Sequence, residues 1–124
     1  MTAGPARLWQ QAEGALVLLA ALSLLWVLGL PFPIWLAVMA FFAPDLTFAF
    51  YAFGPKVGAA AYNTVHLYGF GAVVAMVALL GRVTGLAEIG MLWIAHAGFD
   101  RMLGYGLKLP SGFHATHLGR IGRG

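Results

Sequence analysis

Four long apolar segments dominate this sequence and constrain its fold more than any other feature. Hydrophobic residues make up 61% of the 124 residues, whereas Asp, Glu, Lys and Arg together make up only 9%. A soluble domain has about 25% charged residues, so this chain has too few charges to cover a surface in water. Each segment is close to the roughly 20 residues that cross a hydrocarbon core. The sequence therefore predicts an integral membrane protein surrounded by a lipid bilayer.

We predict an all-α fold, in which a single membrane-embedded domain of residues 1–124 contains four transmembrane helices. Continuous apolar runs disfavour a transmembrane β-barrel, whose strands alternate apolar and polar positions over roughly ten residues. Small residues at 58–61 and the glycines Gly69 and Gly71 indicate close packing between helices. The expected helices cover about residues 8–30, 34–53, 57–80 and 86–103, and a short tail follows at 104–124.

The distribution of Lys and Arg predicts the orientation of the chain. With four spans, Arg82 alone falls on one side of the membrane, and the positive-inside rule places the richer side in the cytoplasm. That richer side carries Arg7, Lys56, Arg101, Lys108, Arg120 and Arg123. Both termini and the tail are then expected in the cytoplasm. This asymmetry accounts for the net charge of +3, so we expect no nucleic-acid partner.

Most polar side chains inside the apolar segments are predicted to lie at one depth, in the cytoplasmic half. Asp45 falls in the lower half of the second segment, His66 in the first turns of the third, and His96 and Asp100 near the end of the fourth. His96 and Asp100 are four residues apart, so they share one helix face. A charged group in lipid costs roughly 2.5 kcal/mol or more, so such groups usually turn inward and pair. We expect His96 and Asp100 to point into the bundle toward His66.

Imidazoles and carboxylates from several segments at one depth fit a divalent first-row metal such as Zn, Mn or Fe. Zinc with an open coordination position lowers the pKa of its bound water to about 7 and generates hydroxide. The sequence has no cysteine, which excludes thiolate ligands. We predict His66, His96, Asp100, His114 and His117 as metal ligands, Asp45 as a catalytic residue (ligand or general base), and Asn63 as a supporting residue.

Each of these residues also has a structural interpretation. Asp45 follows Pro44 and can cap a helix that restarts after the proline. Asn63 and His66 can form interhelical hydrogen bonds worth about 0.6–2 kcal/mol, and Arg101 is expected to extend toward lipid headgroups. Without a metal, the same histidines and carboxylates would form a proton relay. His66 or His96 can alternatively ligate a haem or chlorin.

Several sequence blocks resemble one family of small bacterial integral membrane proteins, catalogued as domain-of-unknown-function family 4260. They are Phe41-Phe42-Ala43-Pro44-Asp45, Gly54-Pro55-Lys56-Val57-Gly58-Ala59, Tyr62-Asn63-Thr64-Val65-His66, His96-Ala97-Gly98-Phe99-Asp100-Arg101, Gly104-Tyr105-Gly106-Leu107-Lys108 and Gly112-Phe113-His114-Ala115-Thr116-His117. The resemblance covers nearly everything from the second segment to the tail, although an acidic residue usually stands at the position of Ala115. It implies a four-span fold in a bacterial inner membrane, and it adds no mechanism.

Two hypotheses for the function follow. The first is a metal-dependent membrane hydrolase that acts on a lipid or amphipathic substrate at the cytoplasmic leaflet. The second is a non-enzymatic accessory subunit of a larger membrane complex, associated with pigment or haem, whose partner is another membrane protein or a second copy of the chain. The number of ligands available to a metal depends on whether His114 and His117 in the tail reach the bundle.

Overall fold

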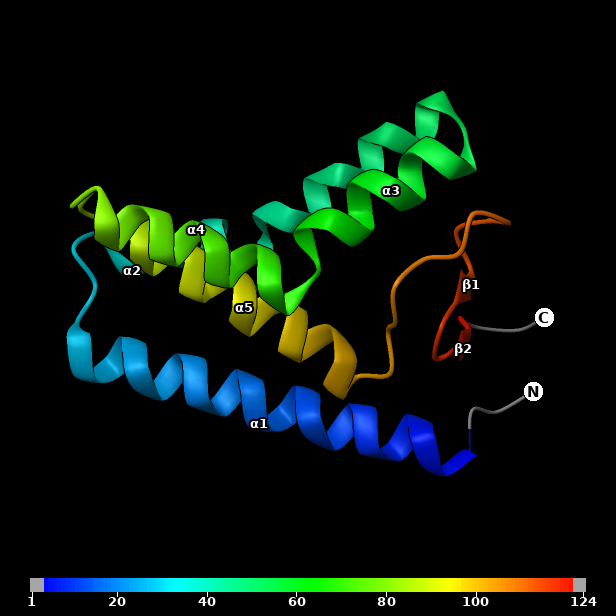
Figure 1. The fold of residues 1–124 in the computed structure, drawn as a ribbon, viewed down its shortest axis with the longest axis horizontal. Coiled ribbons are helices and arrows are strands. Elements are labelled where there is room, and N and C mark those ends of the chain that lie inside the picture. Colours follow the sequence, from blue (N-terminus) through cyan, green and yellow to red (C-terminus); the bar gives the residue numbers. More distant parts are fainter. Residues whose placement is uncertain (1–3, 122–124) are drawn as a thin grey trace.

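A computed structural model describes residues 4–121 of the protein and consists of helices apart from a short C-terminal hairpin (Figure 1). The helices are α1 (Gly4–Leu28), α2 (Ile34–Phe42), the 3₁₀ helix η1 (Ala43–Phe53), α3 (Pro55–Val65), α4 (Tyr68–Leu80) and α5 (Leu86–Met102). Two antiparallel strands, β1 (Ala115–Thr116) and β2 (Gly119–Arg120), lie in the tail. The predicted helical fold is confirmed, and each of the four predicted segments corresponds to one helix or to two consecutive helices. Arg123, which the charge argument counted, lies outside the described residues.

Two helical stretches are long and apolar enough to cross a membrane, Gly4–Leu28 and Ile34–Phe53. A third candidate is the pair α3 and α4, which is bent by 52° at a short break. Helix α5 has 17 residues, so it is about 25 Å long, shorter than a hydrocarbon core of about 30 Å. The described residues thus provide two or three candidate spans, whereas the sequence predicted four.

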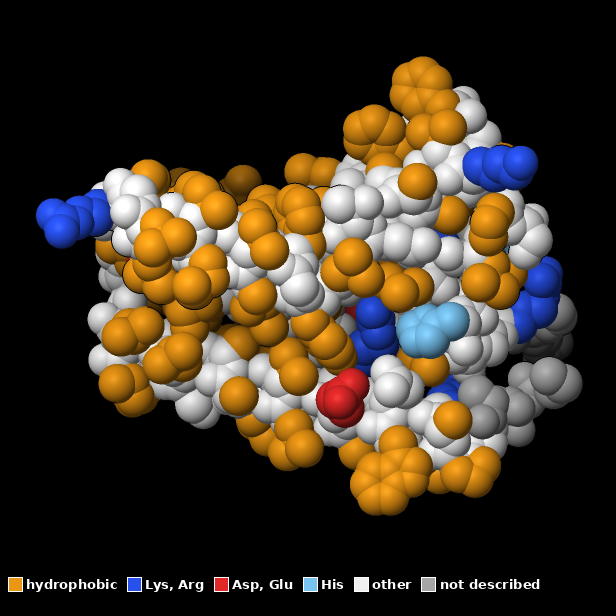
Figure 2. Space-filling model, viewed as in Figure 1, with side chains coloured by type: hydrophobic (Ala, Val, Ile, Leu, Met, Phe, Trp, Pro, Cys, Tyr) orange, Lys and Arg blue, Asp and Glu red, His pale blue; other side chains and the backbone are white. Residues whose placement is uncertain are grey.

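The surface of the protein is apolar over much of its area, as a lipid environment requires. Figure 2 shows hydrophobic side chains across most of one face, with Lys and Arg projecting at its left end and toward its right end. Trp26 is 88% exposed and Leu80 is 80% exposed. Exposed apolar surface on this scale is rare on soluble monomers.

Helix α5 forms the core of the bundle and packs against α1, α4 and α2. Glycines allow α5 to approach α1 and α4 closely. A Cβ atom at Gly98 would lie 2.7 Å from the carbonyl oxygen of Gly14 in α1, and a Cβ atom at Gly90 would lie 2.7 Å from the carbonyl oxygen of Gly71 in α4. The expectation that small residues mediate helix packing therefore holds at Gly71. It does not hold at Gly69, where a Cβ would meet nothing within 4 Å.

The helix pairs α2–η1 and α3–α4 both change their helical geometry next to a polar residue, Asp45 in the first pair and His66 in the second. In the first pair, Pro44 lacks the N–H that an α-helix needs, and the chain continues as an 11-residue 3₁₀ helix, much longer than the usual run of about three to four residues. In the second pair, α3 ends with His66 as its C-cap and α4 begins two residues later. Arg101 Nη2 donates to the His66 carbonyl oxygen, 3.4 Å away, at this break.

The tail folds back onto the bundle and forms a hairpin. The side-chain amide of Asn63 donates to the Lys108 carbonyl at 2.8 Å and accepts from the Lys108 N–H at 2.6 Å. Arg7 Nη1 donates to the carbonyl oxygen of Leu118 at 3.2 Å. Hydrogen bonds from Asn63 and Arg7 to the main chain of the tail therefore hold it against α3 and the start of α1.

Candidate metal centre

Four side chains from three helical elements converge on one point. Asp45 comes from the start of η1, His66 from the C-terminus of α3, and His96 and Asp100 from successive turns of α5. Each offers one ligand atom, and these four atoms all lie within 4.8 Å of one another. The structure thus brings together four of the residues that the sequence predicted for the site.

The distances between the ligand atoms match those of atoms bound to one ion. His66 Nε2 lies 3.2 Å from Asp45 Oδ1 and 3.4 Å from Asp100 Oδ2, and His96 Nε2 lies 3.1 Å and 3.4 Å from the same two oxygens. The two Nε2 atoms are 3.2 Å apart. Ligands of a tetrahedral ion with bonds of about 2.0–2.1 Å are about 3.3–3.4 Å apart. Neighbouring ligands of an octahedral ion with similar bonds are about 3.0 Å apart. The five separations that involve an imidazole nitrogen are therefore close to those around one ion.

The hydrogen bond of the His66 ring places a proton on Nδ1 and leaves Nε2 able to bind a cation. His66 Nδ1 lies 2.7 Å from the carbonyl oxygen of Tyr62, and because a carbonyl only accepts, Nδ1 must carry the proton. In the neutral ring, Nε2 then directs its lone pair at two carboxylate oxygens and at the second imidazole. Two protons, one on each Nε2, would pair the four atoms as two histidinium–carboxylate contacts. One metal ion would bind all four atoms at once.

The surroundings of the group are largely buried and aromatic. His66 is 0% exposed, His96 1% and Asp100 8%, whereas the Asp45 side chain is 35% exposed. The Tyr62 ring stacks on His66 at 3.7 Å between centroids, and its hydroxyl donates to Asp100 Oδ2 at 3.2 Å. Electrostatic interactions are strong in such an environment, and partners such as Tyr62 orient metal ligands. The sequence interpretation gave Tyr62 no role, although it lies one helical turn before His66.

Two sequence interpretations are corrected by this geometry. Asp45 does not cap η1, whose start has no side-chain cap hydrogen bond, because its carboxylate faces His66 and His96 instead. Arg101 does not extend toward headgroups: it is 4% exposed, and its guanidinium lies 5.5 Å from the centre of the Tyr68 ring. Arg101 is buried because other elements cover the end of α5.

The tail histidines, which were also predicted as ligands, are not part of the four-residue group. His117 Nδ1 accepts a hydrogen bond from the Leu107 N–H at 2.8 Å, so this ring helps to hold the tail. Burial and the nearby charge of Arg101 lower the pKa of His117 below its ordinary value. His114 is exposed and touches the Phe113 ring edge-on, at 5.3 Å between centroids. Asn63, predicted as a supporting residue, binds the tail and contacts no ligand of the group by a hydrogen bond among the described residues.

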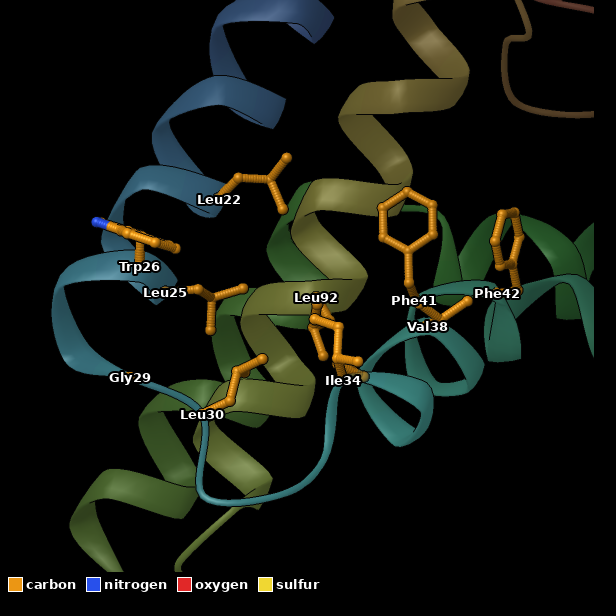
Figure 3. Close-up of a pocket in the computed structure, with 11 residues that line it drawn as sticks. Leu22, Leu25, Trp26, Gly29, Leu30, Ile34, Val38, Phe41, Phe42 and Leu92 are labelled. Carbon is orange, nitrogen blue, oxygen red and sulfur yellow. The ribbon is translucent and has the colours of Figure 1, made fainter.

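Two cavities adjoin the group. The first, of about 260 Å³, is lined by both carboxylate residues, Asp45 and Asp100, together with Tyr62 and Lys108. The second is an apolar groove of about 590 Å³ between α1 and α2 (Figure 3). Phe41 and Phe42 line this groove and also contact His96, at centroid distances of 5.1 Å and 6.0 Å. The group therefore lies between a cavity of mixed charged and aromatic lining and the Phe41–Phe42 wall of an apolar groove.

Comparison with known proteins identifies one family. The family model described as domain of unknown function DUF4260 matches residues 7–121, which include all four converging residues. No curated protein and no solved structure matches the chain. The resemblance carried by the sequence blocks is thereby confirmed, and it also extends over most of the first helix.

Proposed function

The chain belongs to the DUF4260 family, and because that description names no activity, we propose from the geometry that it is a metal-dependent membrane hydrolase. In this proposal Asp45, His66, His96 and Asp100 hold one divalent ion, of the Zn, Mn or Fe type. The substrate is a lipid or another amphipathic molecule at the cytoplasmic leaflet. The excess of Lys and Arg on the side of the tail supports that orientation.

The observation that carries the proposal is the convergence of two imidazole nitrogens and two carboxylate oxygens in a largely buried site, where the N–O and N–N separations are 3.1–3.4 Å. Two imidazoles and two carboxylates are the ligand set that a borderline divalent ion prefers. An ion here would also offset the cost of burying the Asp100 carboxylate, which is otherwise several kcal/mol by order of magnitude. Two carboxylate oxygens beside two imidazoles favour a single ion over a haem, whose axial ligands stand on opposite faces of a wide ring.

The residues of the group differ in what they can do. A divalent ion held here would supply an activated water for hydrolysis. His66, His96 and Asp100 are buried and are suited to hold the ion. Asp45 is the most exposed of the four and lines the cavity of about 260 Å³. It is therefore the carboxylate best placed to accept a proton from attacking water, the general-base role.

The apolar groove supports an amphipathic substrate. Side chains of α1 and α2 face each other across it, among them Leu22 and Leu25 from α1 and Ile34 and Val38 from α2 (Figure 3). Its wall at Phe41 and Phe42 contacts His96 directly. An acyl chain in the groove would therefore bring the polar end of the molecule toward the group.

Hydrolysis can be tested before the substrate is known, by oxygen isotope incorporation. Metal-loaded protein is incubated with a total polar lipid extract in H₂¹⁸O, and the products are analysed by mass spectrometry. We expect a product carrying ¹⁸O with wild type and with Glu88→Gln, a carboxylate near the opposite end of α5. We expect at least a hundredfold less product with Asp45→Asn. Metal-loaded wild type that forms no labelled product from any lipid fraction would contradict hydrolysis and favour an accessory subunit.

A further inference from the structure

We propose that the 260 Å³ cavity beside the four-residue group binds a phosphate-type oxyanion, with the ammonium of Lys108 as its fixed cationic partner. This inference rests on the proposed function, because it names the class of the polar group that the hydrolase would act on. Neither the sequence motifs nor the predicted ligand set assigned a role to Lys108.

Lys108 is buried in a way that a surface lysine is not. It is only 4% exposed, and its Nζ lies 3.9 Å from the centre of the Phe113 ring and 5.0 Å from that of Tyr62. Its main chain is held by both hydrogen bonds of the Asn63 amide. The ammonium is thus held at the cavity wall by its own backbone and by two aromatic faces.

This ammonium has no anionic partner among residues 4–121. The ion pairs there join the two histidines to Asp45 and Asp100, and none includes Lys108. Burial lowers the pKa of Lys108, and the attraction of Asp100 and Asp45 opposes that shift. An anion bound in the cavity would remove the cost of burying the charge.

The charges around the cavity favour an oxyanion. With a divalent ion in place, the carboxylates of Asp45 and Asp100 are offset by that ion. Lys108, which is 4% exposed, is the basic residue in the cavity lining, and it then remains without a carboxylate partner in the described residues. A negative charge on a phosphate group would balance this ammonium.

The size of the cavity limits what part of a ligand it takes. At about 260 Å³, it falls below the roughly 300–1,000 Å³ of sites for drug-sized ligands. It therefore suits a polar headgroup, and the rest of an amphipathic molecule must lie outside it. The same phosphate chemistry is offered by a lipid headgroup and by free phosphate, so the test has to separate these sources.

The test measures anion binding to the metal-loaded full chain in neutral detergent by isothermal titration calorimetry. The probes are inorganic phosphate and a short-chain phosphatidate below its micellar concentration. A hydrogen bond to a charged group corresponds to about tenfold or more in affinity. We expect Lys108→Met to weaken phosphate binding by at least that factor, and Lys56→Met, at an exposed lysine on α3, to leave it unchanged. Lys108→Arg keeps the charge and should bind within a few-fold of wild type.

Metal content and melting temperature are measured on the same samples, so that loss of binding is separated from loss of the ion or of the fold. Phosphate binding by Lys108→Met as tight as by wild type, or no binding of either probe to metal-loaded wild type, would overturn the inference. Tighter binding of the phosphatidate than of phosphate identifies a lipid headgroup as the source, and equal binding identifies the phosphate group alone. Wild type that lacks metal but still binds phosphate through Lys108 would contradict the hydrolase and leave the anion site intact.

Discussion

Replacement of Tyr62 by phenylalanine tests the candidate metal centre with the smallest chemical change. The substitution removes one hydroxyl, which donates to Asp100 Oδ2 at 3.2 Å. It keeps the ring that stacks on His66 and the carbonyl oxygen that fixes the His66 tautomer. Any change in metal affinity then reports the loss of a single hydrogen bond to one ligand.

The expected magnitude follows from that hydrogen bond. A hydrogen bond to a charged group contributes about 1.5–3 kcal/mol, which corresponds to about 10–100-fold in affinity. Loss of an interaction that orients a metal ligand typically costs a similar 10–100-fold. The 3.2 Å separation is long for an O–H···O bond, whose usual distance is about 2.7–2.8 Å. We therefore expect Tyr62→Phe to weaken metal binding by about tenfold, near the lower end of the range.

The assay is a competition titration of the metal between the protein and a chromophoric chelator. Tyr68→Phe is the matched control, because the Tyr68 hydroxyl is buried near the same site and has no hydrogen-bond partner among the described residues. We expect Tyr68→Phe to bind metal as wild type does. An affinity of Tyr62→Phe within twofold of wild type would refute the reasoning, as would an equal loss in both variants.

Three further predictions concern the packing around the site. Asn63→Ala removes two hydrogen bonds to the tail and should destabilise the docked tail by about 1–3 kcal/mol. Trypsin should then cleave the chain faster at Lys108. Cleavage as slow as in the control variant Thr64→Ala would contradict this prediction. Gly98→Ala places a Cβ 2.7 Å from a backbone oxygen of α1 and should lower the unfolding free energy by about 1–3 kcal/mol. The control is Gly69→Ala, where a Cβ meets open space. Equal melting temperatures for the two variants would contradict this prediction. The pKa of His117 in the docked tail lies below its ordinary value of 6.5, so the undocked tail binds more protons. The docked tail should therefore lose stability as the pH falls below about 6.5. The measurement is hydrogen exchange of the Leu107 amide between pH 7.5 and 5.5, corrected for the intrinsic rate, and an unchanged rate would count against the prediction.

The four converging residues were predictable because simple geometric signals mark them. His96 and Asp100 are one helical turn apart, which fixes them to one face of α5. Pro44 marks a disruption of the second segment, and Asp45 follows it directly. The cost of isolated polar groups in lipid supplied the rest of the inference, since it requires such groups to find one another.

Other features leave no comparable signal. Neither proline nor glycine marks the break between α3 and α4 at His66 and Leu67. Tertiary contacts stabilise this break, such as the hydrogen bond from Arg101 to the His66 carbonyl oxygen. Helix α5 is less apolar than α1, α2 and α4, but its hydropathy alone does not show that other helices bury it. The prediction that Arg101 extends toward lipid headgroups was wrong for that reason.

The tail shows a second limit of the sequence. Two histidines three residues apart in a Gly-rich segment suggest ligands, yet the Leu107 N–H occupies one nitrogen of His117. Asn63 and Lys108 are 45 residues apart, and no periodicity links residues at that distance. The position of Lys108 in the cavity therefore depended on the three-dimensional fold.

The most direct test of the central claim is the metal content of the purified protein. The chain is prepared without a polyhistidine tag, which binds metal itself, and its metals are quantified by elemental analysis together with the melting temperature before and after chelation. We predict about one divalent ion per chain in wild type and in His114→Ala, a marked loss in His66→Ala, and a lower melting temperature once chelation removes the ion. Wild type without stoichiometric metal, whose melting temperature is unchanged by chelation, would contradict the account.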